Sequence, residues 1–368
     1  MSDLKFVFVH GLSGWGSYDE KYKRLPYWGM RGGDLMERLR GEGFSCYAAS
    51  VDPSGSAWDR ACELYAQIAG TRTDYGAAHA DLFGHERFGK DFSDKPLVPG
   101  FDESAKLVLA GHSFGGATIR LFAHLMSEGS IEEKNASPET ELSPFFAGGH
   151  GDAIHALVTI AAPHNGTTAY DMLEDPSFDP EKVKVPWWSN AAARMMSRRV
   201  KAAADGRDET DYAAFDMHID NADALNRRLK VPPFTYCFSF PCRFTKSDGT
   251  GNQVPKKKME ELFVKRSYQM GAYAGTTRGG IITDDSWKEN DGLVNTVSAM
   301  APSHAPAKEF DKKNIEPGIW QVMPTVDGDH MALQGGLVHR HEVYSFYRKL
   351  LAMISRLKQE SSEKGGNV

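Results

Sequence analysis

The sequence predicts an α/β protein with a central, mostly parallel sheet flanked by helices. Apolar runs at residues 5–9, 107–110 and 154–160 are typical of buried strands. A helical pattern at residues 117–126 follows the second of these runs. Strands that alternate with helices in this way favour a parallel sheet in one α/β domain.

The first expected strand, residues 5–9, ends in a glycine-rich segment, His10–Gly16. A loop at the carboxyl end of a strand can present a backbone N–H to a developing oxyanion, and Leu12 is the candidate donor. The alternative is a glycine-rich turn without a catalytic role. A helix through Leu35, Met36 and Leu39 follows, and then a second strand at residues 44–51.

Residues 53–100 precede the 107–110 strand and are expected to form an insertion. Asp59, His79 and His85 lie within it. Imidazole and carboxylate groups are suitable ligands for a cation such as zinc. Scattered residues of these types also form ordinary surface hydrogen bonds, so spacing alone leaves both interpretations open.

A Gly-x-Ser-x-Gly motif lies between the 107–110 strand and the 117–126 helix, within Gly111–Gly116. Strand, motif and helix in this order indicate a nucleophile elbow, in which Ser113 would be the nucleophile. The backbone N–H of Phe114 would be the second oxyanion donor. The alternative is a structural turn between strand and helix.

Residues 127–150 are polar and are expected to form loops, and residues 154–160 form the next strand. The expected insertion at 169–222 combines apolar and basic side chains. Its apolar members are Trp187, Trp188, Met195 and Met196. We interpret this segment as a mobile cap over the active site, with a helix packed on the core as the alternative.

The C-terminal part is expected to contain strands at 234–240 and 319–323, a long loop region at 241–285 and a helix at about 340–357. Where the serine nucleophile lies on a strand–turn–helix elbow of this kind, Asp or Glu follows the serine in the chain and His comes last. Asp291, in an Asn-Asp-Gly turn, and His330, after the last strand, fit this order. Spacing does not exclude the alternative acids Asp284, Asp285 and Asp311, and His304, His339 and His341 are competing bases. One domain, 1–358, followed by a polar tail, 359–368, is expected.

Bulk properties exclude several classes of function. The 368 residues carry a net charge of −6 without a long basic run, so nucleic-acid binding is not expected. No apolar stretch is long enough to span a bilayer. Four cysteines are too few for a disulfide scaffold. Cys237 and Cys242 are expected as free thiols, with a local bridge as the alternative.

The N-terminus is expected to lack a signal peptide, because residues 4–9 run directly into His10 and Gly11 as a core strand. The chain would then be either cytoplasmic or the mature form of a secreted protein.

Several longer motifs make a resemblance specific. They are HGLSGWG (10–16), YWG (27–29), WDRACE (58–63), DYGAAH (74–79), GHERFG (84–89), GGH (148–150), TIAAPHNGTT (159–168), ENDGLVNT (289–296) and DH (329–330). With these motifs the chain resembles the zinc-containing bacterial true lipases of the thermophilic Bacillus/Geobacillus and staphylococcal type.

The resemblance implies an α/β-hydrolase fold and hydrolysis of carboxylic esters, with an ester or lipid as substrate. It implies Ser113 as nucleophile, Asp291 as orienting acid and His330 as base. It also implies a structural zinc ion held by Asp59, His79, His85 and a fourth, downstream Asp. That last ligand lies in an Asp-apolar pair before a short helix and is matched here to Asp216.

Departures from the family pattern refine these expectations. Phe114 replaces a common Gln and is expected to make the rim of the site more apolar, and Leu12 replaces a common Phe. Residues 331–337 carry no carboxylate, so the calcium site of the family is expected to be absent. The cap between Asn165 and Asp216 looks shorter, which favours a broad esterase or polyesterase as the alternative to a true lipase. A catalytically silent binding protein is the third alternative.

Overall fold

The computed structural model describes residues 4–101, 105–190, 208–336 and 342–358. Met195 and Met196 of the expected cap, and the competing bases His339 and His341, lie outside these residues. Within the described residues, no helix combines the length and the apolar character that crossing a membrane requires.

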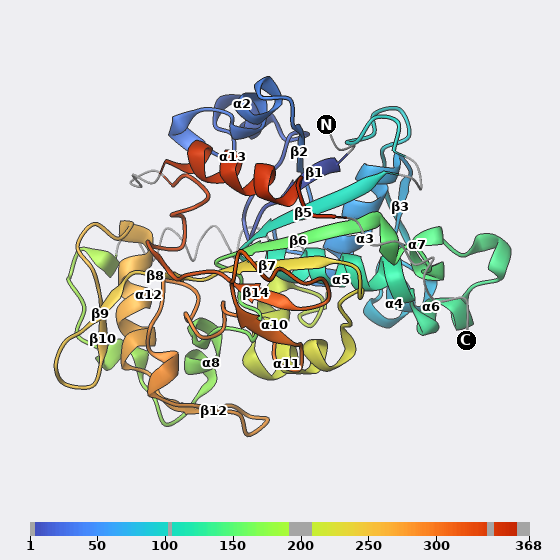
Figure 1. The fold of residues 1–368 in the computed structure, drawn as a ribbon. Helices are drawn as coiled ribbons and strands as arrows, with labels where there is room; N and C mark the ends of the chain where they lie inside the picture. The colour runs from blue at the N-terminus through green and yellow to red at the C-terminus, as the bar shows by residue number, and fades with distance from the viewer. Residues whose placement is uncertain (1–3, 102–104, 191–207, 337–341, 359–368) are drawn as a thin grey trace.

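A seven-stranded sheet forms the centre of the molecule (Figure 1). All of its neighbouring strands pair in parallel. Its order is β13 (Ala307–Glu309), β14 (Trp320–Val322), β7 (Tyr236–Phe240), β6 (Ile154–Ile160), β5 (Lys106–His112), β1 (Leu4–Val9) and β2 (Ser45–Ala49). The predicted parallel sheet is therefore present, and the short edge strand β13 was not predicted.

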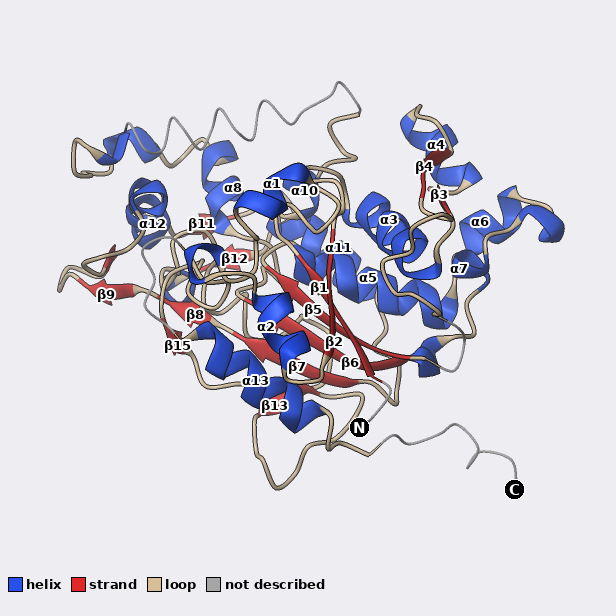
Figure 2. Ribbon diagram, turned by 90° about the horizontal axis from the view of Figure 1, so that it is seen from above, coloured by secondary structure: helices blue, strands red, loops and turns tan. Residues whose placement is uncertain are grey.

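Helices cover both faces of the sheet (Figure 2). Strand residues alternate between the two faces: Val7 and Val9 of β1 belong to one buried cluster, and Phe6 and Phe8 belong to the other. The first cluster is covered by α3 (Ala57–Ala69) and α5 (Gly115–Glu128), and the second by α2 (Leu35–Gly41) and α13 (Val343–Ile354).

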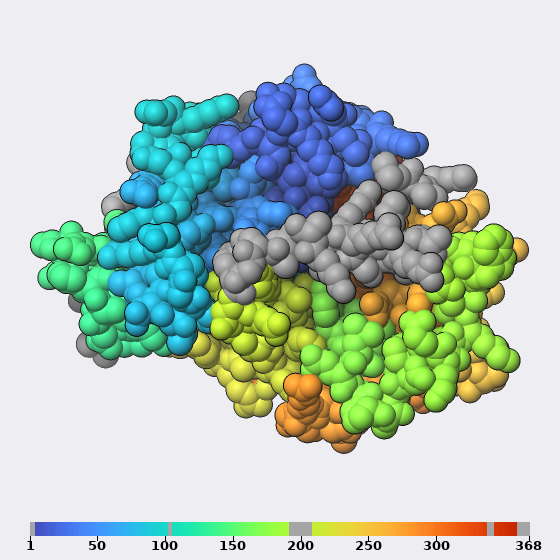
Figure 3. Space-filling view, turned by 180° about the vertical axis from the view of Figure 1, so that it is seen from behind, coloured from blue at the N-terminus to red at the C-terminus, as the bar shows by residue number. Residues whose placement is uncertain are grey.

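Two side regions extend from the sheet. Beside α3, the antiparallel pair β3 (Arg72–Asp74) and β4 (Phe88–Asp91) encloses α4 (Ala77–Phe83), and α6 (Ile131–Ala136) and α7 (Pro144–Ala147) lie next to them. In the space-filling view, these light-blue and green residues form one flank of the molecule (Figure 3). At the opposite end lie α8 (Thr168–Glu174), α12 (Glu261–Ala272), β8 (Cys242–Arg243), β9 (Thr245–Ser247), β10 (Gln253–Pro255), β11 (Gly275–Thr276), β12 (Ile282–Thr283) and β15 (Val326–Asp327). Short helices elsewhere are α1 (Glu20–Arg24), α10 (Ala213–Asp216) and α11 (Ile219–Arg228).

Two loop expectations are wrong. Residues 127–150 contain α6 and α7, and residues 241–285 contain the twelve-residue helix α12. Phe263, Val264 and Met270 of α12 are buried, so an apolar face that packs against neighbouring segments stabilises this helix despite its polar sequence.

The four cysteines are free and buried. Cys237 belongs to the cluster on one face of the sheet and Cys242 to the cluster on the other. The expectation of free thiols is therefore confirmed.

Candidate active site and metal centre

The nucleophile elbow is built where β5 meets α5. Ser113 has a φ of +55°, a left-handed conformation that costs energy for a residue with a side chain and is typical of functional turns. A Cβ at Gly115 would lie 2.4 Å from the carbonyl oxygen of Val9. The helix therefore starts close to β1 only because residue 115 is glycine.

His330 lies between Ser113 and Asp291. Its Nε2 is 2.8 Å from the Ser113 hydroxyl oxygen, and its Nδ1 is 2.9 Å from Oδ2 of Asp291. All three side chains are buried. Because the Asp291 carboxylate can only accept, Nδ1 of His330 carries the proton, and Nε2 is free to accept the proton of the serine hydroxyl.

The turn around Asp291 fixes the carboxylate. Oδ1 of Asp291 accepts hydrogen bonds from the backbone N–H groups of Leu293 (3.0 Å) and Val294 (2.8 Å). The backbone N–H of His330 donates to the carbonyl oxygen of Asp291 at 2.9 Å. Acid and base are therefore held together by backbone as well as side-chain contacts.

The competing residues that the structure describes have other partners. His304 contacts Asp223 at 2.8 Å. Asp284 and Asp311 accept hydrogen bonds from backbone N–H groups two residues further along the chain, and Asp285 pairs with Lys288. The structure thus brings Asp291 and His330 to Ser113.

The two candidate oxyanion donors flank the nucleophile. Phe114 is the residue before α5, and Leu12 follows β1 in a loop fixed by the hydrogen bond from Ser13 N–H to the Pro53 carbonyl (2.7 Å). The expectation that the Phe114 side chain makes the rim apolar is wrong. Its ring is fully buried, with the guanidinium carbon of Arg60 5.3 Å from the ring centroid. The tight turn directs this side chain into the core beneath α5.

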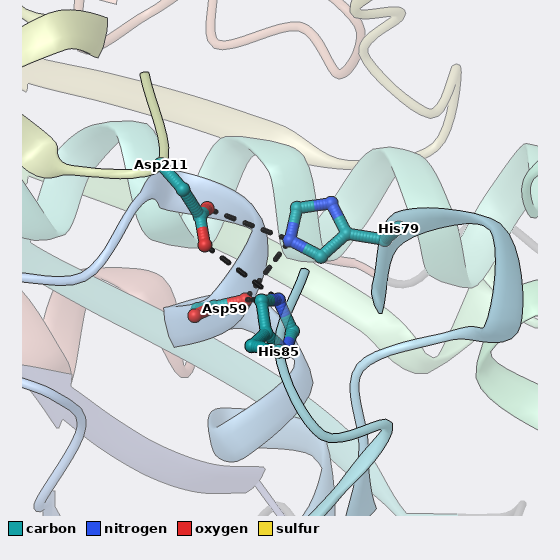
Figure 4. A group of neighbouring side chains, drawn as sticks. All are labelled: Asp59, His79, His85 and Asp211. Atoms are coloured by element: carbon teal, nitrogen blue, oxygen red, sulfur yellow. Dashed lines mark hydrogen bonds and ion pairs between the residues drawn. The ribbon is translucent and has the colours of Figure 1, made fainter. Parts of the chain in front are cut away.

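A second cluster lies on the flank of α3 (Figure 4). Asp59 of α3, His79 of α4, His85 and Asp211 each offer one ligand atom, and these atoms lie within 4.8 Å of one another. The fourth member corrects the prediction of Asp216. Instead, the half-buried Asp216 accepts a hydrogen bond from the backbone N–H of Ala57 (2.7 Å) at the start of α3.

The same sequence signal also fits Asp211. Asp211 and the following Tyr212 form an aspartate-aromatic pair directly before the short helix α10. Asp216 instead ends that helix. Its burial raises its pKa to about 7, because a carboxylate loses solvation there.

The hydrogen bonding of the cluster is suitable for a metal ion. Nδ1 of His85 is 2.9 Å from the carbonyl oxygen of Glu86 and donates to it, so in the neutral ring the buried Nε2 presents a lone pair without a hydrogen-bond donor. Nε2 of His85 lies 3.6 Å from Oδ2 of Asp211, and both carboxylate oxygens of Asp211 are buried without a hydrogen bond. Acceptors that face one another in a buried place are costly unless a metal ion lies between them. Two imidazole nitrogens and two carboxylate oxygens form a suitable four-ligand set.

Of the expected cap residues, Trp187 and Trp188 are described and are 85% and 40% exposed. The absence of the family's calcium site stays a prediction.

Most of this chain matches one known protein family. Residues 3–179 and 192–364 match the family described as "Lipase-like, C-terminal domain". This chain belongs to that family. "Lipase 2" of Staphylococcus aureus is 31% identical to it over 355 residues, covering 89% of this chain and 50% of the relative. The chain thus spans about half the length of the curated relatives that it matches.

Three solved structures are similar to this chain over almost its whole length. EstA from Clostridium botulinum has a TM-score of 0.84 and 30% identity, covering 98% of this chain and 89% of that one. The lipase of Staphylococcus hyicus has a TM-score of 0.78 and 27% identity, covering 96% of both chains. Lipase 1 from Pelosinus fermentans has a TM-score of 0.78 and 30% identity, covering 97% of this chain and all of that one. The predicted α/β-hydrolase fold and the resemblance to bacterial true lipases are confirmed.

Proposed function

We propose that this chain is a serine carboxylic ester hydrolase that works through an acyl-enzyme. The observation that carries the proposal is the 2.8 Å contact from His330 Nε2 to the Ser113 hydroxyl, in a buried group completed by Asp291. A serine hydroxyl is a weak nucleophile until a base takes its proton. Relatives named lipase support the same reaction class.

The reaction proceeds in two steps, acylation of Ser113 and hydrolysis of the acyl-enzyme. Ser113 Oγ attacks the ester carbonyl carbon while its proton passes to His330 Nε2, and Asp291 stabilises the resulting imidazolium. The backbone N–H groups of Leu12 and Phe114 bind the oxyanion. Collapse of the tetrahedral intermediate expels the alcohol, which takes the proton from His330. A water molecule, activated by the same base, then releases the acid and restores Ser113.

Replacement of the nucleophile tests the proposal. Ser113→Ala is expected to lower kcat on p-nitrophenyl esters by about 10⁶-fold and to abolish labelling by a fluorophosphonate probe. Ser355→Ala, which removes a hydroxyl bonded to the Leu351 carbonyl on α13, is the matched control and is expected to retain full activity. Undiminished turnover in Ser113→Ala would overturn the proposal, and a wild-type chain that neither turns over nor labels would support the silent binding protein instead.

We propose zinc as the cation of the Asp59, His79, His85 and Asp211 cluster. The mixed nitrogen and oxygen ligand set supports zinc. When bound, the ion would neutralise the two carboxylates and link α3, α4 and the segment before α10. Four protein ligands leave no open position for substrate, so its role would be structural.

We further propose an apolar acyl substrate that the enzyme meets at a lipid surface. The exposed side chain of Trp187 supports this, because an indole ring readily enters a membrane or emulsion interface. A broad esterase or polyesterase with little interfacial activation is the alternative, and the two differ in their dependence on acyl-chain length and on an interface.

A further inference from the structure

Two buried aromatic side chains connect the parts of the proposed catalytic site. The Tyr27 hydroxyl oxygen is 2.6 Å from Nδ1 of His112 and 3.1 Å from the backbone nitrogen of Gly11. Nε2 of His112 is 2.7 Å from the carbonyl oxygen of His330. The side chains of Tyr27 and His112 are 3% and 1% exposed, so water does not compete for these contacts.

The direction of each hydrogen bond in this Tyr27–His112 network follows from the groups at its ends. The His330 carbonyl oxygen can only accept and the Gly11 N–H can only donate, so in a neutral His112 ring Nδ1 accepts the proton of the Tyr27 hydroxyl. His112 must then carry its proton on Nε2, which donates to the His330 carbonyl. Burial, and repulsion from His330 when that ring is protonated, lower the pKa of His112 to about 3, so the His112 ring stays neutral.

This hydrogen-bonded chain joins three segments that are distant in sequence. Gly11 precedes the candidate oxyanion donor Leu12, His112 precedes the nucleophile, and His330 is the base. The segments must approach closely, since a Cβ at Gly11 would lie 2.7 Å from the Cβ of Ser113. Ser113 and His330 contact each other through their side chains, whereas the bonds of Tyr27 and His112 reach the backbones of Gly11 and His330.

The surrounding packing makes this connection rigid. The ring centroids of His112 and His330 are 4.9 Å apart, and Trp28, fully buried, lies 6.2 Å from His112 in an edge-to-face arrangement. Trp28 in turn packs edge-to-face on Phe8 of β1 and on Tyr347 of α13. A shift of His112 would therefore disturb the core of the sheet.

We propose that Tyr27 and His112 are positioning residues that set the distance between the oxyanion loop, Ser113 and His330. The inference rests on the ester hydrolase function proposed above. Tyr27 and His112 act through the backbones of Gly11 and His330 and do not touch the substrate. Their effect is on the barrier of the chemical step, since small displacements of reacting groups are costly there.

Removal of one oxygen atom tests the proposal. Tyr27→Phe is expected to lower kcat on a soluble p-nitrophenyl ester by about 10- to 100-fold and to leave KM within about twofold. Tyr236→Phe is the matched control, because it removes a hydroxyl that donates to the Lys358 carbonyl at 2.9 Å far from the site. Tyr27→Phe with the kcat of wild type, or Tyr236→Phe with an equal loss, would overturn the proposal.

Two further measurements separate positioning from a loss of fold. His112→Gln can accept from Tyr27 and donate to His330, so it is expected to retain at least tenfold more kcat than His112→Ala at equal melting temperature. In ¹⁵N-histidine spectra, His112 is expected as the Nε2–H tautomer in wild type and to lose that fixed state in Tyr27→Phe. Equal activity of the two His112 variants, or an unchanged spectrum in Tyr27→Phe, would contradict the proposal. A failure of the proposed function is recognised separately, because Ser113→Ala would then turn over esters as fast as the wild-type protein.

Discussion

At the scale of single residues, the candidate site depends on where protons are held. Asp291 has one carboxylate oxygen bonded to two backbone N–H groups and the other to Nδ1 of His330. This arrangement leaves His330 with a basic Nε2 directed at Ser113. The left-handed backbone of Ser113 (φ +55°) keeps the hydroxyl in place for that contact.

Asp291→Asn tests this distribution of protons. The Asn oxygen can still accept from Leu293 and Val294, but its amide would donate to Nδ1 of His330 and move the imidazole proton to Nε2. We expect kcat to fall by about 10⁴-fold with the fold intact, measured by steady-state kinetics and circular dichroism. Asp223→Asn, at the exposed Asp223–His304 pair, is the control and should match wild type. A small effect of Asp291→Asn would show that this carboxylate does not set the tautomer.

At the scale of elements, α3 connects the candidate metal-binding cluster with the loop of the candidate oxyanion donor Leu12. Asp59 is a ligand candidate, and the next residue, Arg60, is fully buried. The Arg60 guanidinium donates to the carbonyl oxygens of His10 and Asp52 and to the hydroxyl of Thr118 on α5. A cation that holds α3 against α4 would therefore also support the loop that carries Leu12.

Sequence patterns predicted the elements whose signal is local. Strands β1, β5 and β6 could be predicted from their apolar runs alone, and the elbow could be predicted from its glycines. The helix α12 was missed because its stability comes from packing of Phe263, Val264 and Met270. Asp211 was missed because two aspartates lie five residues apart around α10, and only the folded chain decides which one faces His85.

Variants of these two aspartates distinguish their roles. Asp211→Ala is expected to abolish stoichiometric metal binding, measured by elemental analysis, and to lower the melting temperature as much as a chelator does in wild type. Asp216→Ala is expected to retain the metal and to lose about 1 kcal/mol of stability, because the N–H of Ala57 loses its acceptor. Retention of the metal in Asp211→Ala would contradict the assignment of Asp211 as a ligand. Loss of the metal in Asp216→Ala only would instead support Asp216 as the fourth ligand.

At the scale of the whole molecule, the parallel topology of the sheet places the candidate catalytic residues at one edge of the sheet. Gly11 follows β1, Ser113 follows β5, and His330 comes after β14 and the short strand β15; the carboxyl ends of parallel strands meet at the same edge. The candidate metal-binding cluster lies on the flank of α3 instead. The candidate catalytic residues and the candidate metal ligands thus lie in different parts of the fold, although Asp59 and Arg60 of α3 contact both parts.

The exposed Trp187 should govern behaviour at a lipid surface. A tryptophan buries roughly 150–250 Å² when it is fully enclosed, and partial insertion would contribute about 1.4 kcal/mol, or a tenfold change in adsorption. Trp187→Ser is therefore expected to lower the rate on emulsified long-chain esters about tenfold and to leave the rate on soluble short-chain esters unchanged. The control is Ile282→Ser, at a residue that is 70% exposed on β12. Rates measured above and below the solubility limit of each ester check the difference. If Trp187→Ser has equal rates to wild type on both substrates, the enzyme hydrolyses esters without a lipid surface, as the broad esterase would.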